Sequence, residues 1–194
     1  MRRAGSFVLT YLALAFLVTA CTEPPNTEMD RAQGAIDAAR AAGAEQYATT
    51  EYAAATAALK SANEAVAAGD YRLALNHALA SHERAQNAAR DTANTKARMR
   101  ADADRAVTEI AALVAKGQAR IAAAERARPP NRLFAQPAEE LAAASAQLQK
   151  AGEAVAAGDY VAANAALDGL KARVDQALAA VDEATRSQSS RRRR

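Results

Sequence analysis

The sequence predicts an all-α fold of elongated antiparallel helical hairpins packed as a bundle, with two related hairpin repeats. Three observations support this prediction. Alanine fills 59 of the 194 positions, against only 8 glycines, 5 prolines and no tryptophan, and alanine has the highest intrinsic helix propensity. Apolar residues recur at intervals of three and four over long stretches, as on one face of a helix. The octapeptide EAVAAGDY occurs twice, at residues 64–71 and 153–160.

Composition and charge also exclude several classes of function. Buried alanine removes little apolar area from water, and each Å² contributes only about 25 cal/mol, so thin hairpins suit this chain better than a globule with a wide cavity. We therefore expect no small-molecule substrate. The chain has 25 basic and 22 acidic residues, but the body between residue 20 and the last four arginines has 19 and 22. Its basic charge lies at its two ends, which does not indicate a nucleic-acid-binding protein.

Residues 1–20 are predicted to be a signal peptide. Arg2 and Arg3 precede an apolar run, Phe7–Val18, that is too short to span a bilayer comfortably. The segment Val18-Thr19-Ala20-Cys21 resembles the lipobox of bacterial lipoproteins, and Cys21 is the only cysteine. The resemblance implies cleavage before Cys21 and covalent attachment of a diacylglyceryl group and an N-acyl chain to it, with no other cofactor. An ordinary signal peptide that ends near a cysteine is the alternative.

The residues after Cys21 predict the cellular location of the protein and a short tether. In lipoproteins of enteric bacteria, an aspartate directly after the cysteine favours retention in the inner membrane. This chain has Thr22 there, so the resemblance implies an outer-membrane lipoprotein of the bacterial cell envelope that faces the periplasm. Residues 21–27 would form a short lipid-anchored tether, because Pro24 and Pro25 stiffen the backbone and block a helix.

The helices that we expect after the tether are residues 28–43, 49–68, 71–127, 137–157 and 159–186. Thr49 or Thr50 could cap the second helix, and Pro137 suits the start of the fourth. The third helix contains no proline; it is either continuous or broken near Asp91–Thr95. The domains predicted from this are a first hairpin repeat with the long helix (28–127), a second hairpin repeat (128–186) and a disordered basic tail (187–194).

Each copy of EAVAAGDY is interpreted as the tip of a helical hairpin. Gly69 and Gly158 suit the left-handed residue just past a helix end, and the following aspartates, Asp70 and Asp159, suit the N-cap of the next helix. Tyr71 and Tyr160 would open that helix and pack at the corner. The offset of 89 also aligns apolar residues of the preceding helices, such as Leu59 with Leu148. These six turn residues are therefore predicted to be structural.

Two resemblances to known families follow from these motifs. A Gly-Asp-Tyr turn with alanine three residues on, at Ala74 and Ala163, is similar to tetratricopeptide hairpins, although a spacing of 89 residues departs from their 34-residue period. The segment Ala39-Arg40-Ala41-Ala42-Gly43-Ala44, followed by Tyr47-Ala48 and the Gly-Asp-Tyr turn, resembles a family of small alanine-rich bacterial lipoproteins that carry a domain of unknown function. This second resemblance implies no catalytic residues.

No catalytic or metal-binding motif is evident in the sequence. His77 and His82 are five residues apart, so on a helix they do not share a face as i, i+4 ligands do, and we expect no metal. There is no phosphate-binding glycine loop and no nucleophile elbow, so we expect no enzyme. The run Arg191, Arg192, Arg193 and Arg194 could contact an anionic surface or remain a solvated tail.

These observations predict a non-enzymatic helical interaction or scaffold module. It would be anchored to the membrane by lipid and would dock another protein of the envelope. The alternative is a structural envelope spacer that associates with itself or non-covalently with peptidoglycan.

Overall fold

The structure is a computed structural model that describes residues 23–127 and 132–192. These residues form helices joined by short turns, and no strand is found among them. The prediction of an all-α helical bundle is therefore confirmed. The chain divides into two compact units, one ending at Thr95 and the other beginning at Lys96. The predicted signal peptide and Cys21 lie outside the described residues.

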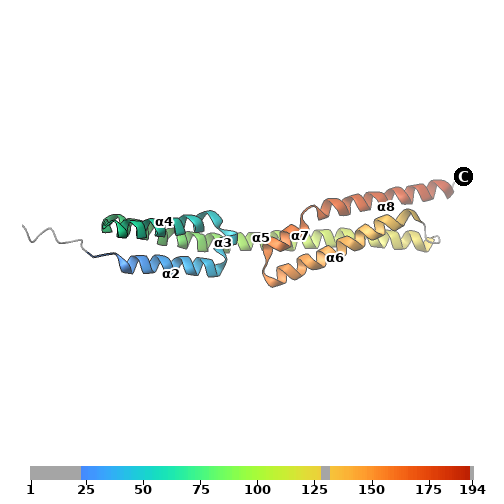
Figure 1. Ribbon diagram of the computed structural model, residues 1–194. Coiled ribbons are helices and arrows are strands. Elements are labelled where there is room, and N and C mark those ends of the chain that lie inside the picture. The colour runs from blue at the N-terminus through green and yellow to red at the C-terminus, as the bar shows by residue number, and fades with distance from the viewer. Residues whose placement is uncertain (1–22, 128–131, 193–194) are drawn as a thin grey trace, which may run out of the picture. The chain divides into compact units, whose positions relative to one another are not determined.

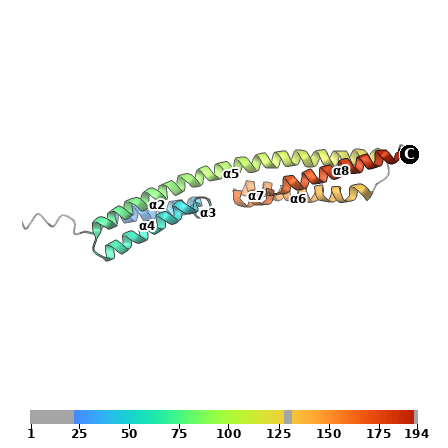
Figure 2. The ribbon, with the colours of Figure 1, turned by 90° about the horizontal axis from the view of Figure 1, so that it is seen from above.

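The first unit contains α2 (Asn26–Ala42), the short α3 (Ala44–Tyr47), α4 (Thr49–Ala67) and the first part of α5 (Tyr71–Ala127). The chain reverses direction after α2 and again after α4, so three helices pack side by side (Figures 1 and 2). Ile36, Tyr52 and Leu59 are the largest buried residues of this core, and alanines from all three long helices fill the rest. Small side chains suit such close helix packing.

The second unit contains the remainder of α5, a 3₁₀ turn (Arg132–Phe134), α6 (Ala135–Ala157), α7 (Tyr160–Leu167) and α8 (Leu170–Arg192). Its core is more aliphatic than that of the first unit. Leu141, Leu170, Val174 and Val181 from α6 and α8 are almost fully buried, and Phe134 closes the core at the 3₁₀ turn.

The two units bury corresponding residues when the sequence is shifted by 89. Eleven such pairs are buried in both units: Ala32 and Ile121, Tyr52 and Leu141, Ala55 and Ala144, Leu59 and Leu148, Ala62 and Ala151, Ala74 and Ala163, Ala78 and Leu167, Ser81 and Leu170, Ala85 and Val174, Ala88 and Ala177, and Thr92 and Val181. Each unit thus has the same order of helices and the same register of core positions. The octapeptide is the most visible part of a longer repeat.

Several features differ from the sequence-based expectations. Ala48, without a side-chain cap, stands at the N-cap of α4, so the expected cap by Thr49 or Thr50 is wrong. The helix α2 begins at Asn26, inside the segment 21–27 that is predicted to be a tether.

The long helix α5 is continuous from Tyr71 to Ala127, and the contacts divide the chain within it rather than at the proline pair after residue 128. The predicted last helix, 159–186, is broken into α7 and α8, because Asp168 is extended (ψ 130°) and Gly169 has a φ of +66°. The prediction of disorder from residue 187 is wrong as far as Arg192, since α8 continues to that residue.

Candidate functional site

The first hairpin turn joins α4 to α5 through a left-handed glycine. Gly69 has a φ of +75°, and its N–H donates to Val66 O while Asp70 N–H donates to Ala65 O. This pair of bonds is the Schellman motif, which satisfies carbonyl groups at a helix end. The Asp70 carboxylate then accepts from Leu73 N–H at 2.9 Å, so one residue ends the turn and caps α5.

The second turn repeats this geometry between α6 and α7. Gly158 has a φ of +78°, with bonds from its own N–H to Val155 O and from Asp159 N–H to Ala154 O. Asp159 accepts from Ala162 N–H at 3.0 Å. Each carboxylate is engaged with backbone within its own unit, as expected for a helix cap.

Arg40 ties α2 to α4 in the first unit. Its Nε donates to Tyr52 Oη at 2.8 Å and to Glu45 Oε1 at 3.1 Å, and its guanidinium carbon lies 5.8 Å from the centre of the Tyr52 ring. The hydrogen bond to Glu45, followed by that to Tyr52, raises the pKa of Arg40 above its usual value. The guanidinium therefore holds a nearly buried tyrosine hydroxyl in a hydrogen bond at the edge of the core.

The neighbours of Arg40 explain the rest of that sequence segment. Ala39 and Ala44 are fully buried, which leaves no room for larger side chains. Gly43 has a φ of +98° and donates its N–H to the last carbonyls of α2, so it allows the chain to turn into α3. The pattern Ala-Arg-x-x-Gly-Ala is thus a packing and turning motif rather than a reactive site.

Residues 27–106 match the family model of DUF4398, a domain of unknown function. The match covers α2, α3, α4 and the part of α5 that packs with them, so it contains the Arg40 segment and the first Gly-Asp-Tyr turn. No curated protein and no solved structure matches the chain.

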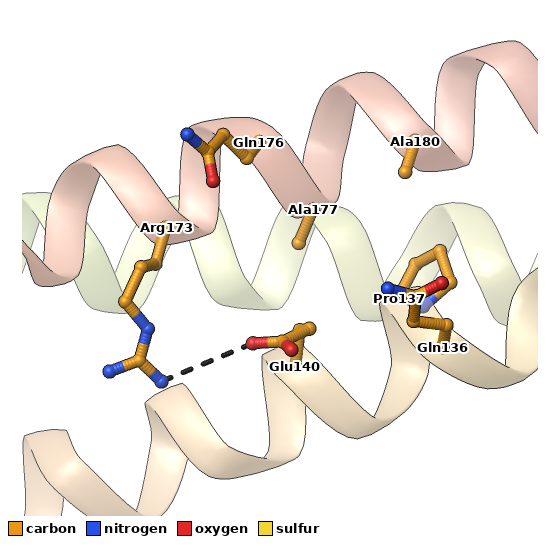
Figure 3. Close-up of a pocket in the computed structure, with 7 residues that line it drawn as sticks. All are labelled: Gln136, Pro137, Glu140, Arg173, Gln176, Ala177 and Ala180. Atoms are coloured by element: carbon orange, nitrogen blue, oxygen red, sulfur yellow. Dashed lines mark ion pairs between the residues drawn. The ribbon is translucent and has the colours of Figure 1, made fainter.

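The second unit contains a hollow between α6 and α8, with a volume of about 340 Å³ (Figure 3). From α6 it is lined by Gln136, Pro137 and Glu140, and from α8 by Arg173, Gln176, Ala177 and Ala180. Arg173 and Glu140 point toward one another across it, with Nη2 and Oε2 4.0 Å apart. We call this hollow the α6–α8 groove.

The ion pair of the groove has a counterpart in the first unit. Arg84 Nη1 of α5 lies 3.6 Å from Glu51 Oε2 of α4, and these residues precede Arg173 and Glu140 by 89 positions. Sequence reasoning assigned none of these four residues to a site. The offset of 89 could have indicated them, because it aligns glutamate with glutamate and arginine with arginine at positions that core packing does not require to be charged.

The other candidates from the sequence that lie in the described ranges do not gather into a site there. His82 faces Gln86 of its own helix, 3.4 Å away. Within the described ranges, no three His, Cys, Asp or Glu side chains gather as metal ligands, and no helix there is long and apolar enough to cross a membrane. The backbones of Arg191 and Arg192 end α8, but their side chains, and all of Arg193 and Arg194, lie outside the described part.

Proposed function

We propose that the chain is an outer-membrane lipoprotein, anchored through Cys21, whose helical body faces the periplasm and docks another envelope protein. The anchor rests on the sequence: two arginines, an apolar segment and the box that ends at Cys21. Two or more acyl chains hold a protein stably at a membrane, whereas one chain holds it weakly. The function proposed is non-enzymatic, and the body acts as an interaction or scaffold module.

The short distance in sequence between Cys21 and the first helix is the main observation that supports docking near the membrane. Asn26 begins α2 only five residues after Cys21, and an extended chain covers at most about 3.6 Å per residue. A lipid on Cys21 would therefore hold the start of α2 within roughly 18 Å of the bilayer surface. Such a short tether favours a partner that itself lies at the membrane.

The first unit also offers a surface for a partner. Leu73 and Leu79 of α5 are 43% and 51% exposed, which is more than the other large hydrophobic residues of the described chain. Leu79 corresponds to Asp168 in the second repeat, where the helix breaks instead. Exposed leucines on the unit that follows the anchor in the sequence are consistent with a docking surface. The alternative, a spacer that binds itself or peptidoglycan, predicts a different set of crosslinks.

The anchor is tested by metabolic labelling with an alkyne fatty acid, comparing the protein with Cys21→Ala. We expect label in the membrane fraction for the protein and none for the variant. Docking is tested with a photo-crosslinking amino acid at Leu79 and, as a matched control, at the exposed position Arg105. One envelope protein captured from position 79 and not from 105 supports docking. Self-crosslinks and peptidoglycan fragments alone would support the spacer instead.

A further inference from the structure

The guanidinium of Arg173 in the α6–α8 groove is held by a neighbouring side chain. Arg173 Nη1 donates to Gln147 Oε1 at 3.1 Å, and Gln147 Nε2 donates to the carbonyl of Ala166 at 2.7 Å. That carbonyl lies in the last turn of α7, where helical carbonyls lack their usual N–H partners. The break after α7 thus orients Gln147, and Gln147 orients Arg173.

The first unit lacks the residues that build this arrangement. Its equivalents of Gln147, Gly169 and Pro137 are all alanines, at positions 58, 80 and 48, and α5 is continuous through the equivalent of the break. The Arg–Glu pair is common to both units. Only the second unit has Gln147, which bonds to the arginine, and Pro137, which lines the groove. Packing needs do not account for this difference, because the two units share their core register.

The polar groups of the groove are only loosely engaged with each other. The side chains of Arg173 and Glu140 are 46% and 50% exposed. Their closest charged atoms, Nη2 and Oε2, are 4.0 Å apart, which is long for an ion pair. Such an exposed pair adds little to stability. A guanidinium presents a planar fork of donors that matches a carboxylate, and Gln136 and Gln176 line the same space.

We propose that the α6–α8 groove binds the carboxylate end of a short peptide with small side chains. The terminal carboxylate would pair with Arg173, Glu140 would accept a peptide N–H or an ammonium group, and the two glutamine amides would bind peptide groups. Pro137 and Ala177 form walls that admit methyl-sized side chains. A volume near 340 Å³ lies at the small end of the range for ligand sites, about 300–1,000 Å³. The inference depends neither on the lipid anchor nor on a docked protein.

The test titrates the full chain with trialanine, with trialaninamide and with N-acetyl-trialanine, followed by calorimetry or by NMR of the glutamine side-chain amides. We expect saturable binding of trialanine and at least tenfold weaker binding of the amide, which lacks the carboxylate. N-acetyl-trialanine represents the C-terminal end of a longer chain. If both trialanine and N-acetyl-trialanine bind, the groove is assigned to protein C-termini. If only trialanine binds, it is assigned to free peptides. Binding of neither overturns the proposal.

Variants locate the binding and separate it from folding. Arg173→Gln should weaken trialanine binding at least tenfold, while Arg84→Gln, the equivalent change in the first unit, should leave it unchanged. Gln147→Leu tests positioning: it should reduce the preference for trialanine over trialaninamide, a ratio that a purely structural residue would not alter. If Arg173→Gln and Arg84→Gln weakened trialanine binding equally, the assignment to this groove would be contradicted. It would also be contradicted if Arg173→Gln still bound trialanine and Gln147→Leu left the ratio of trialanine to trialaninamide affinity unchanged.

Discussion

Gly117 of α5 lies so close to Leu141 of α6 that a Cβ atom on the glycine would be 2.6 Å from Leu141 Cδ1. The same atom would be 3.0 Å from Leu178 Cδ2 of α8. Gly117 therefore stands where three helices of the second unit approach each other, in the middle of a helix where glycine is otherwise unfavourable. Leu141, which packs against this glycine, is fully buried.

Gly117→Ala is expected to destabilise the protein. Overpacking a core costs about 1–3 kcal/mol, and the better helix propensity of alanine returns about 1 kcal/mol, so we expect a net loss of up to about 2 kcal/mol in the free energy of unfolding. Chemical denaturation monitored by circular dichroism measures this. Gly152→Ala is the matched control, because nothing lies within 4 Å of its Cβ position in α6; it should stabilise. Stabilisation by both changes would contradict the close approach.

Much of this fold could be predicted from the sequence because local signals agree with one another. The turns at Gly69 and Gly158 follow from a residue type that tolerates positive φ, next to an aspartate that caps. The break at Asp168–Gly169 was harder to predict, since Val174 and its neighbours keep an unbroken heptad spacing across it. A single Gly after Asp within a periodic run carries little local signal, and tertiary contacts determine whether the helix stops there.

The α6–α8 groove could not be predicted from composition or periodicity. It depends on where Ala177 and Pro137 come to face each other from helices that are distant in sequence. Its arginine donates to Gln147, and Gln147 in turn donates to the carbonyl of Ala166 in the last turn before the unpredicted break. The repeat offset would have indicated the Arg–Glu pair but not the space beside it.

The two hairpin glycines should be sensitive to substitution for a purely conformational reason. Nothing lies within 4 Å of a Cβ at Gly69 or Gly158, so a larger side chain meets no clash. Both have positive φ, a region that β-branched residues rarely adopt. Gly69→Val and Gly158→Val should each cost on the order of 1 kcal/mol or more. Thermal melts measure this, and Gly34→Val, in an open helical position, should cost less; three equal effects would refute the left-handed turns.

Lys171 should give the stability of the second unit a dependence on pH in the alkaline range. It lies 3.1 Å from Asp175 Oδ2 and 3.5 Å from Glu109 Oε1, and these carboxylates, Asp175 foremost, raise its pKa above the usual value. A raised pKa in the folded state means that the stabilisation is fully present below about pH 10 and is lost as the pH rises through the shifted value.

The measurement is the difference in melting temperature between the protein and Lys171→Met, from about pH 8 to about pH 12. We expect the protein to be the more stable below about pH 10 and the difference to disappear at the upper end. Lys150→Met, at an exposed position in α6, should show no such trend. A difference that grows with pH would have the wrong sign and would exclude this contribution.

Ser81 of α5 should stabilise the first unit through one buried hydrogen bond. Its hydroxyl donates to Ala55 O of α4 at 2.8 Å, and the residue is fully buried. The second repeat has Leu170 at this position, so an apolar contact there replaces the bond. Ser81→Ala should lower the free energy of unfolding by about 0.5–1.5 kcal/mol, measured by denaturation. Ser189→Ala, which removes an exposed hydroxyl bonded within its own helix, should stay within about 0.5 kcal/mol of the protein. If Ser81→Ala were as stable as Ser189→Ala, apolar packing alone would hold α4 and α5 together.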